Sequence, residues 1–154
     1  MTLLILSKLI AKAAAKVEAE IEALVHSGVE PVLAAEIGRA KRIDDGRFRY
    51  AERIKATFPA GMRLDGLKVV IDCANGAAYK VGPTVFEELG AEVFAIGVEP
   101  NGRNINKGCG SLYPEKLAAK VRELRGDVGI AVDGDADRSV MTCEKGEIID
   151  GDAM

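Results

Sequence analysis

Residues 128–138 read Val-Gly-Ile-Ala-Val-Asp-Gly-Asp-Ala-Asp-Arg, an apolar run followed at once by three alternating aspartates and an arginine. The apolar run, Val128–Val132, has the length of one strand and is bounded by turn-forming residues, so we expect a buried strand. The acidic stretch Asp133–Arg138 would then form the loop at the C-terminal end of that strand. Open α/β sheets place their ligand sites at this end of their strands.

The chain before this loop alternates strand and helix patterns. We expect strands at residues 67–72 and 92–96, and helices at residues 77–89 and 114–124. Strand–helix–strand–helix–strand at this spacing predicts an α/β fold with right-handed crossovers, built as a three-layer α/β/α domain. A hairpin with strands at residues 139–143 and 147–150, turning at Lys145-Gly146, would make the small sheet mixed.

The first third of the chain is helical in character. Apolar residues recur at helical spacing over residues 7–26, and Gly28 would end that helix. Its mixed charges favour a helix that covers a core over a docking or membrane-surface element. A second helix is expected from about residue 44 to 57, with Asp44 or Asp45 as its cap. Its predicted apolar stripe consists of Phe48, Ala51, Ile54 and Phe58.

A domain junction is expected at Pro59-Ala60-Gly61, where turn formers interrupt the pattern. The prediction is therefore a helical N-terminal segment over residues 1–59, from a neighbouring domain, followed by the α/β domain over residues 60–154. The chain reaches Met154 straight after a strand pattern, which favours a piece of a longer protein.

Composition narrows the class of partner and the compartment. The net charge is −3 and no basic run occurs, which argues against nucleic acid as a partner. The apolar start ends at Ser7-Lys8, too early for a membrane span or a signal peptide. Cys73, Cys109 and Cys143 lie far apart and the chain has one histidine, so we expect no zinc site or disulfide framework and a cytoplasmic location.

The acidic loop predicts a divalent-metal site. Ionised carboxylates 4 Å apart repel one another by about 4 kcal/mol per pair at an effective dielectric constant near 20, so they require a cation unless they spread apart into water. An all-oxygen ligand set suits Mg²⁺ or Ca²⁺. No phosphate-binding GxxxxGK[ST] loop or GxSxG elbow is present, and His26 lies far from any nucleophile in the sequence.

Four interpretations of this loop remain open. In a phosphoryl-transfer loop, the three aspartates hold one Mg²⁺ and Arg138 faces a phosphate. An EF-hand would use Glu144 as its last ligand, but Arg138 stands where glycine is required and strands are predicted on both sides. An aspartyl-phosphate phosphatase would use Asp133 as nucleophile and Asp135 as acid–base. The fourth interpretation is a solvated acidic turn.

The segment Asp133–Arg138 resembles the metal-binding loop of the α-D-phosphohexomutase superfamily. Further segments narrow the resemblance to the phosphoglucosamine mutase family; these are residues 38–45, 72–79, 99–102, 104–106, 108–111 and 150–152. The similarity runs from about Lys16 to Met154. Its motifs are specific because they are separated in the chain and follow one another in the order and spacing of the family.

The resemblance implies a four-domain enzyme that interconverts glucosamine 6-phosphate and glucosamine 1-phosphate through a phosphoserine. It implies that Asp133, Asp135 and Asp137 bind Mg²⁺ and that Arg138 lies near the transferring phosphate. The phosphoserine and sugar-recognition segments do not occur in this sequence. We therefore expect the tail of the first domain plus the second domain, inactive alone, with a phosphosugar substrate only in the full-length context. Self-association through an exposed apolar edge is also expected, and the rival interpretation is a free-standing, non-catalytic metal-binding module.

Overall fold

The structure is a computed structural model that describes residues 2–28, 30, 31, 33–149 and 151, with side chains from residue 15 onward. The chain divides into two compact units, Met1–Arg42 and Ile43–Met154. The first unit contains helix α1 (Thr2–Ser27), which starts earlier than predicted and is followed by Gly28 at φ +79°. Across the described residues, the structure offers no helix of the length and apolarity that a membrane span demands.

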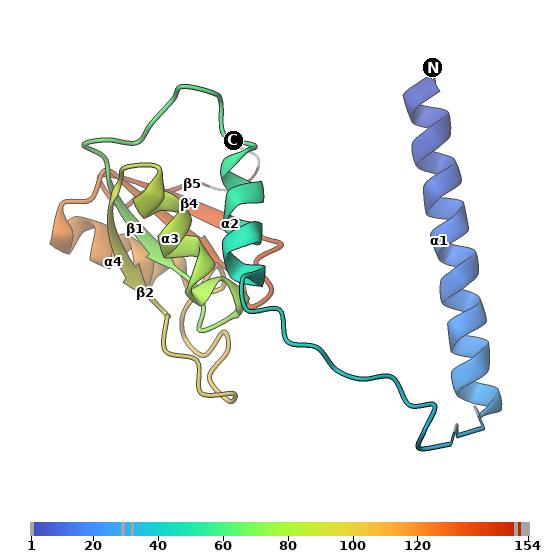
Figure 1. Cartoon of the computed structure of the whole chain (residues 1–154). Coiled ribbons are helices and arrows are strands. Elements are labelled where there is room, and N and C mark those ends of the chain that lie inside the picture. Colours follow the sequence, from blue (N-terminus) through green and yellow to red (C-terminus); the bar gives the residue numbers. More distant parts are fainter. Residues whose placement is uncertain (1, 29, 32, 150, 152–154) are drawn as a thin grey trace. The chain divides into compact units, whose positions relative to one another are not determined.

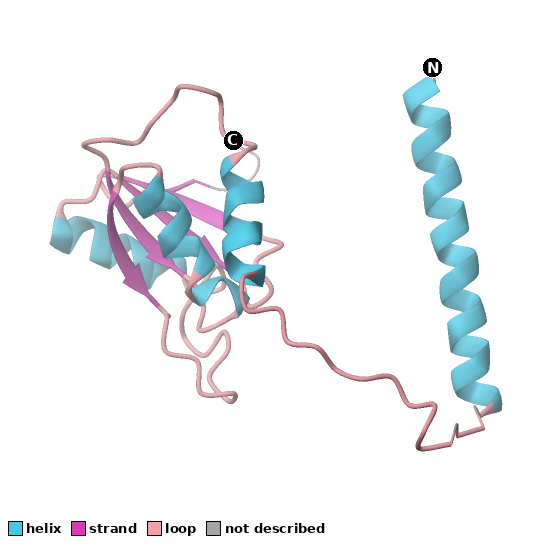
Figure 2. Ribbon diagram, viewed as in Figure 1, coloured by secondary structure: helices cyan, strands magenta, loops and turns pink. Residues whose placement is uncertain are grey.

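The second unit is built on a five-stranded mixed sheet with the strand order β2-β1-β3-β4-β5 (Figures 1 and 2). Its strands are β1 (Lys68–Asp72), β2 (Glu92–Ile96), β3 (Val128–Val132), β4 (Ser139–Cys143) and β5 (Ile148–Ile149). Strand β1 pairs in parallel with β2 and β3, whereas β4 runs antiparallel to both β3 and β5. The predicted mixed sheet is confirmed, including the closing hairpin.

Helices cover both faces of this sheet, which confirms the three-layer α/β/α prediction. Because side chains alternate along a strand, β1 sends Val70 toward α4 (Pro114–Leu124) and Ile71 toward α3 (Val81–Glu88). The α4 side forms a core of four fully buried or nearly buried residues, namely Val70, Leu117, Val121 and Ala131. Burial contributes about 1.5–3 kcal/mol for each of the valine and leucine side chains. Helices pack on both faces of the sheet and hold its strands in the observed register.

Gly129 in β3 lets α4 lie close to the sheet. A Cβ atom at this position would come within 2.7 Å of Val121 and 2.9 Å of Leu117, and it would collide with the Thr142 hydroxyl of β4. Such distances are too short for real side chains, so the absence of a side chain here sets the spacing between helix and sheet.

Helix α2 (Gly46–Lys55) belongs to the same unit as the sheet, because it packs against α3 (Figure 1). Ala51 is buried at this contact, and the Lys55 ammonium group forms ion pairs with Glu52 of its own helix and Glu88 of α3. The predicted junction at residues 59–61 lies inside this unit. As a boundary between domains of the family it stays a prediction.

Three local expectations are corrected by the structure. Phe48 leaves the predicted apolar stripe of α2, since 63% of it is exposed. Asp45 precedes α2 but does not cap a backbone N–H, because its carboxylate accepts a hydrogen bond from Arg49 Nε at 2.8 Å. The helix predicted at residues 77–89 begins instead as a 3₁₀ turn, η1 (Ala77–Tyr79), before α3 starts at Val81.

Candidate metal centre

The loop after β3 is held in place by the loop after β1. The N–H of Ala77 donates to the carbonyl oxygen of Gly134 at 2.8 Å, and a Cβ atom on Gly76 would collide with that same peptide. Within the acidic loop, the N–H of Ala136 donates to the carbonyl oxygen of Asp133 at 3.1 Å, with Ala136 at φ +63°. Both loops lie at the C-terminal edge of the parallel strands, where α/β sheets place their ligand sites.

The three predicted ligands come together in this loop. Each of Asp133, Asp135 and Asp137 offers a carboxylate oxygen, and these oxygens all lie within 4.8 Å of one another. Asp133 is 1% exposed, whereas Asp135 and Asp137 are exposed to solvent. Neighbouring ligands of an octahedral Mg²⁺ are about 3 Å apart and opposite ligands about 4.2 Å, so the carboxylates would have to draw together to bind that ion. The set of donors fits a hard divalent cation.

Arg138 is bound to the buried ligand of this set. Its Nε and Nη2 atoms lie 2.7 and 2.6 Å from Asp133 Oδ2, and its backbone N–H donates to Asp133 Oδ1 at 3.2 Å. Burial pushes the pKa of Asp133 upward, but the hydrogen bonds and charge of Arg138 outweigh it and leave that pKa below its usual value. The guanidinium therefore neutralises Asp133 in this structure.

Known proteins resemble the domain that carries this loop. Residues 48–146 match the family model described as phosphoglucomutase/phosphomannomutase, alpha/beta/alpha domain II. The chain belongs to this family. The resemblance to phosphohexomutases stated from the sequence is thereby confirmed.

The similar curated relatives are phosphoglucosamine mutases. The protein of Jannaschia sp. (strain CCS1) is 62% identical over 132 residues, which cover 86% of this chain and 30% of the relative. That of Caulobacter vibrioides (strain NA1000 / CB15N) is 60% identical over 134 residues, again 86% of this chain and 30% of the relative. The chain thus spans about 30% of the length of these relatives.

A solved structure shows the same fold. It is the crystal structure of a phosphoglucomutase/phosphomannomutase family protein from Burkholderia thailandensis, 30% identical, with a TM-score of 0.55. The match covers 67% of this chain and 22% of that chain. The α/β domain described above is therefore the phosphohexomutase domain II fold.

Two other interpretations of the acidic loop do not fit the structure. Glu144 follows β4, a five-residue strand that is about 16 Å long, so it lies at the other end of the sheet from Asp133 and cannot complete an EF-hand. Strands β3 and β4 flank the loop in place of helices. An aspartyl-phosphate phosphatase requires an accessible nucleophile, whereas Asp133 is 1% exposed.

The sequence analysis did not predict the contacts that Asn75 and the loop over residues 97–113 make beside the acidic loop. Asn75, at φ +51°, accepts a hydrogen bond from the N–H of Glu99 at 3.0 Å and donates toward the carbonyl oxygen of Asn104 at 3.4 Å. The N–H of Asn106 donates to the carbonyl oxygen of Ala74 at 2.8 Å, and a Cβ on Gly134 would contact Ile105. The available signal was the Asn-rich loop over residues 97–113, visible below β2 in Figure 2.

Proposed function

We propose that this chain is the metal-binding domain of a phosphoglucosamine mutase. In this role, Asp133, Asp135 and Asp137 hold Mg²⁺ while a phosphoryl group moves between the 6- and 1-positions of glucosamine phosphate. The phosphoserine that donates the group would lie in a part of the enzyme outside this sequence. The observation that carries the proposal is the convergence of three carboxylate oxygens within 4.8 Å beside an arginine, in a family domain.

The loop residues have distinct tasks in this proposal. A divalent cation bound here would polarise and neutralise phosphate oxygens, which is the main requirement of phosphoryl transfer. Asp133 would anchor it from the buried end of β3, and the two exposed aspartates would close around it. Arg138 would then leave Asp133 and turn its guanidinium, 68% exposed, toward the phosphate.

Calorimetric titration with Mg²⁺ tests the metal site. We expect weak binding to this chain, because phosphate would normally complete the coordination, and at least a tenfold loss in Asp135→Asn. Asp65→Asn is the matched control, since it removes one exposed carboxylate that pairs with Arg63 outside the loop. Equal binding in both variants would contradict the assignment. A strong preference for Ca²⁺ would favour the free-standing metal-binding module instead.

A complementation assay tests the enzymatic role. Mutase turnover should require a 1:1 mixture of this chain with a protein that supplies the phosphoserine domain and the remaining domains. Asp135→Asn should abolish the mutase turnover of the mixture, whereas Asp65→Asn should preserve it. Turnover of glucosamine phosphate by this chain alone would contradict the proposal, because no phosphoserine motif occurs in its sequence.

A further inference from the structure

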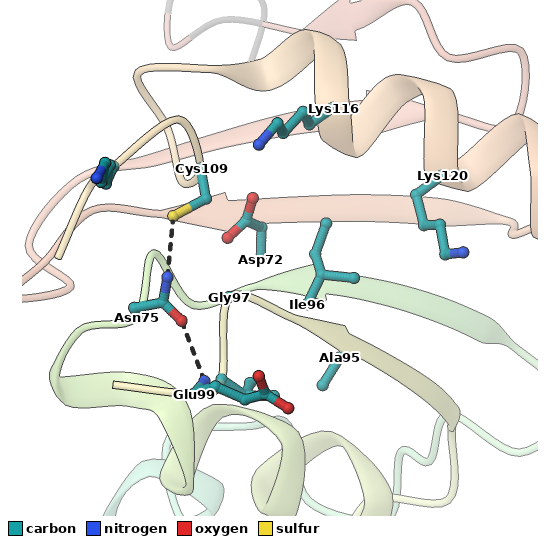
Figure 3. A pocket seen from close by; sticks show the side chains of 11 residues that line it. Asp72, Asn75, Ala95, Ile96, Gly97, Glu99, Cys109, Lys116 and Lys120 are labelled. Carbon is teal, nitrogen blue, oxygen red and sulfur yellow. Dashed lines mark hydrogen bonds between the residues drawn. The ribbon is translucent and has the colours of Figure 1, made fainter. Parts of the chain in front are cut away.

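A second hollow lies beside the C-terminal ends of β1 and β2, next to the first turns of α4 (Figure 3). Its volume is about 500 Å³, within the range of small-molecule sites. Its polar lining includes Asp72, Asn75, Glu99, Lys107, Lys116 and Lys120. None of its lining residues belongs to the acidic loop over residues 133–138, so this hollow, the β1–α4 cavity, is a separate feature.

Asp72 is the buried charge of the β1–α4 cavity. It ends β1 on the face that packs against α4, paired in register with Ile96 of β2. Its side chain has no exposed surface, and its Oδ1 accepts a hydrogen bond from the N–H of Ala74 at 2.9 Å. Its Oδ2 is buried and has no hydrogen-bond partner among the described residues. A buried carboxylate oxygen without a donor is costly and therefore requires an explanation.

Three lysines bring positive charge to the same cavity. Lys116 and Lys120 lie one turn apart on α4, and Figure 3 shows both side chains reaching over the cavity from that helix. Lys120 pairs with Glu123 at 2.8 Å, whereas the ammonium groups of Lys107 and Lys116 have no ion-pair partner in the described part of the chain. Three ammonium groups against the two carboxylates of Asp72 and Glu99 leave the lining with a net positive charge, which favours an anion.

We propose that the β1–α4 cavity binds a small phosphorylated polyol. Lys107, Lys116 and Lys120 hold the phosphate, and a hydroxyl group of the same molecule donates to Oδ2 of Asp72. The ligand thus satisfies the lysines and the carboxylate together. A simple anion without a donor group would meet repulsion from Asp72 at the inner end, and the lysines exclude a metal ion.

Gly97 and Asn75 surround Asp72 at the inner end of the cavity. Gly97 lies beside Asp72, since a Cβ on Gly97 would collide with Asp72 Oδ1. Asn75 bridges the two sides of the cavity, because its amide contacts Cys109 Sγ at 3.4 Å and the N–H of Glu99 at 3.0 Å (Figure 3). Because Asp72 is fully buried, a hydroxyl group reaches Oδ2 only after the side chains that cover it move aside.

Two probes, inorganic phosphate and sorbitol 6-phosphate, test the proposal by NMR on the full chain with EDTA present. The readout is the shift of the backbone amides of Gly97, Val98 and Gly108 during titration. We expect sorbitol 6-phosphate to bind at least about tenfold more tightly than phosphate, a difference of about 1.4 kcal/mol. The double variant Lys107→Gln/Lys116→Gln should weaken both, whereas Lys145→Gln, an exposed lysine of the β4–β5 turn, should leave both unchanged.

Asp72→Asn separates the two halves of the site. Asparagine keeps an oxygen for the Ala74 N–H but replaces the free oxygen by an NH₂ group that cannot accept a hydroxyl hydrogen. The advantage of sorbitol 6-phosphate over phosphate should therefore vanish, while phosphate itself binds no more weakly. An unchanged ratio in Asp72→Asn with a native amide spectrum, or no amide shifts with either probe, would overturn the proposal.

The outcome is independent of the metal loop. EDTA removes divalent cations, and the same titration in Asp135→Asn should give the same affinities because Asp135 does not line the β1–α4 cavity. Loss of polyol phosphate binding in Asp135→Asn would place the ligand at the acidic loop and overturn the assignment. Failure of the Mg²⁺ titration, in contrast, would leave this result unaffected.

Discussion

Arg138 binds the buried carboxylate of Asp133 through two guanidinium nitrogens, at 2.7 and 2.6 Å from the same oxygen, Oδ2. The acidic loop therefore carries its own counter-ion on the carboxylate that the proposed metal site would use. If a metal ion binds there, its binding and the release of Arg138 would be coupled, because one carboxylate oxygen cannot serve both partners at full strength. Release would deliver the guanidinium to the phosphate only when the cation is in place.

Arg138→Met should raise the Mg²⁺ affinity of the chain several-fold at pH 7.5. The variant removes the cation that competes for Asp133 while it keeps all three carboxylates. Calorimetric titration of the variant against the parent measures this effect. Arg53→Met serves as the control, since Arg53 is an exposed residue of α2 outside the loop. Weaker binding in Arg138→Met would show that the guanidinium supports the metal-ready loop instead of competing with the ion.

The Asp133–Arg138 pair should stabilise the fold at neutral pH and less so in acid. The pKa of Asp133 is lowered in the folded chain, and the corresponding pKa of an unfolded chain is about 3.9. The contribution of this ion pair to the free energy of unfolding is therefore complete above about pH 5, and it is lost as the pH falls through the folded-state pKa of Asp133. In Arg138→Met the pKa of Asp133 should rise, because burial then acts without the opposing guanidinium, and this acid-dependent loss of stability should shrink or disappear.

Urea unfolding between pH 7 and pH 3, with carbon NMR of the Asp133 carboxyl group, measures both quantities. The Asp65–Arg63 pair is an internal reference, since the Arg63 hydrogen bond also lowers the pKa of Asp65. A carboxyl titration of Asp133 at or above the model-peptide pKa in the parent chain would contradict this expectation.

The strands and helices that were predicted best from the sequence are those bounded by turn-forming or helix-starting residues. Strands β2, β3 and β4 match the predicted residues 92–96, 128–132 and 139–143, because turn formers bound each apolar run. Pro114 likewise opens α4 as expected, since its fixed φ and missing N–H suit the first helical position. The approach of the three carboxylates could also be predicted locally, because they belong to alternate residues of one short loop.

What the sequence did not reveal depends on contacts between distant segments. The ion pair between Arg138 and Asp133 depends on the side-chain conformations, which the spacing of the two residues in the sequence does not determine. Phe48 has the spacing of an apolar helix face, but it is exposed, because the face of α2 that packs on α3 is centred on Ala51. The β1–α4 cavity unites Asp72 with Lys116 across 44 positions of sequence, and only the sheet register brings them together.

Gly76→Ala should destabilise the domain by about 1–3 kcal/mol, the usual cost of overpacking a tight contact. The new methyl group would collide with the Gly134 peptide, and so push the β1 loop away from the acidic loop. Urea unfolding measures the stability, and Mg²⁺ titration measures the damage to the loop. Gly38→Ala is the matched control because a Cβ there meets nothing within 4 Å. Equal stability of the two variants would contradict the close approach of the loops.

The three cysteines should differ in their reaction with a thiol reagent at pH 8. Burial, and then the Asp72 carboxylate, raise the pKa of Cys73 to about 12, so only about one Cys73 thiol in ten thousand is ionised. Burial also raises the pKa of Cys109, with Lys116 and Asn75 opposing the shift. Cys143 is only partly buried, so it should be labelled first.

Mass spectrometry of the labelled chain gives the rate for each thiol. In urea all three cysteines should react at similar rates, which shows that protection depends on the fold. Labelling of Cys73 as fast as Cys143 in the native chain would contradict the buried position of Cys73.

Limited trypsin digestion should cut the chain before α2 and leave residues 43–154 as the resistant product. Arg39, Lys41 and Arg42 are exposed and lie outside any helix or strand. Arg63 is also exposed, but a cut there should not release α2, because Ala51 is buried against the domain and Lys55 pairs with Glu88 of α3. Mass spectrometry of fragments that co-elute in gel filtration identifies the retained segment.

Ala51→Asp supplies the contrast for this experiment. A carboxylate at a position that is 3% exposed cannot be buried without a partner, so α2 should detach and trypsin should reach Lys55 as well as Arg63. The parent chain would then hold residues 43–63 on the domain after cleavage, whereas the variant would lose them. If the parent released this segment as fast as the variant, α2 would not belong to the unit that carries the acidic loop, and the junction predicted at residues 59–61 would describe the chain better.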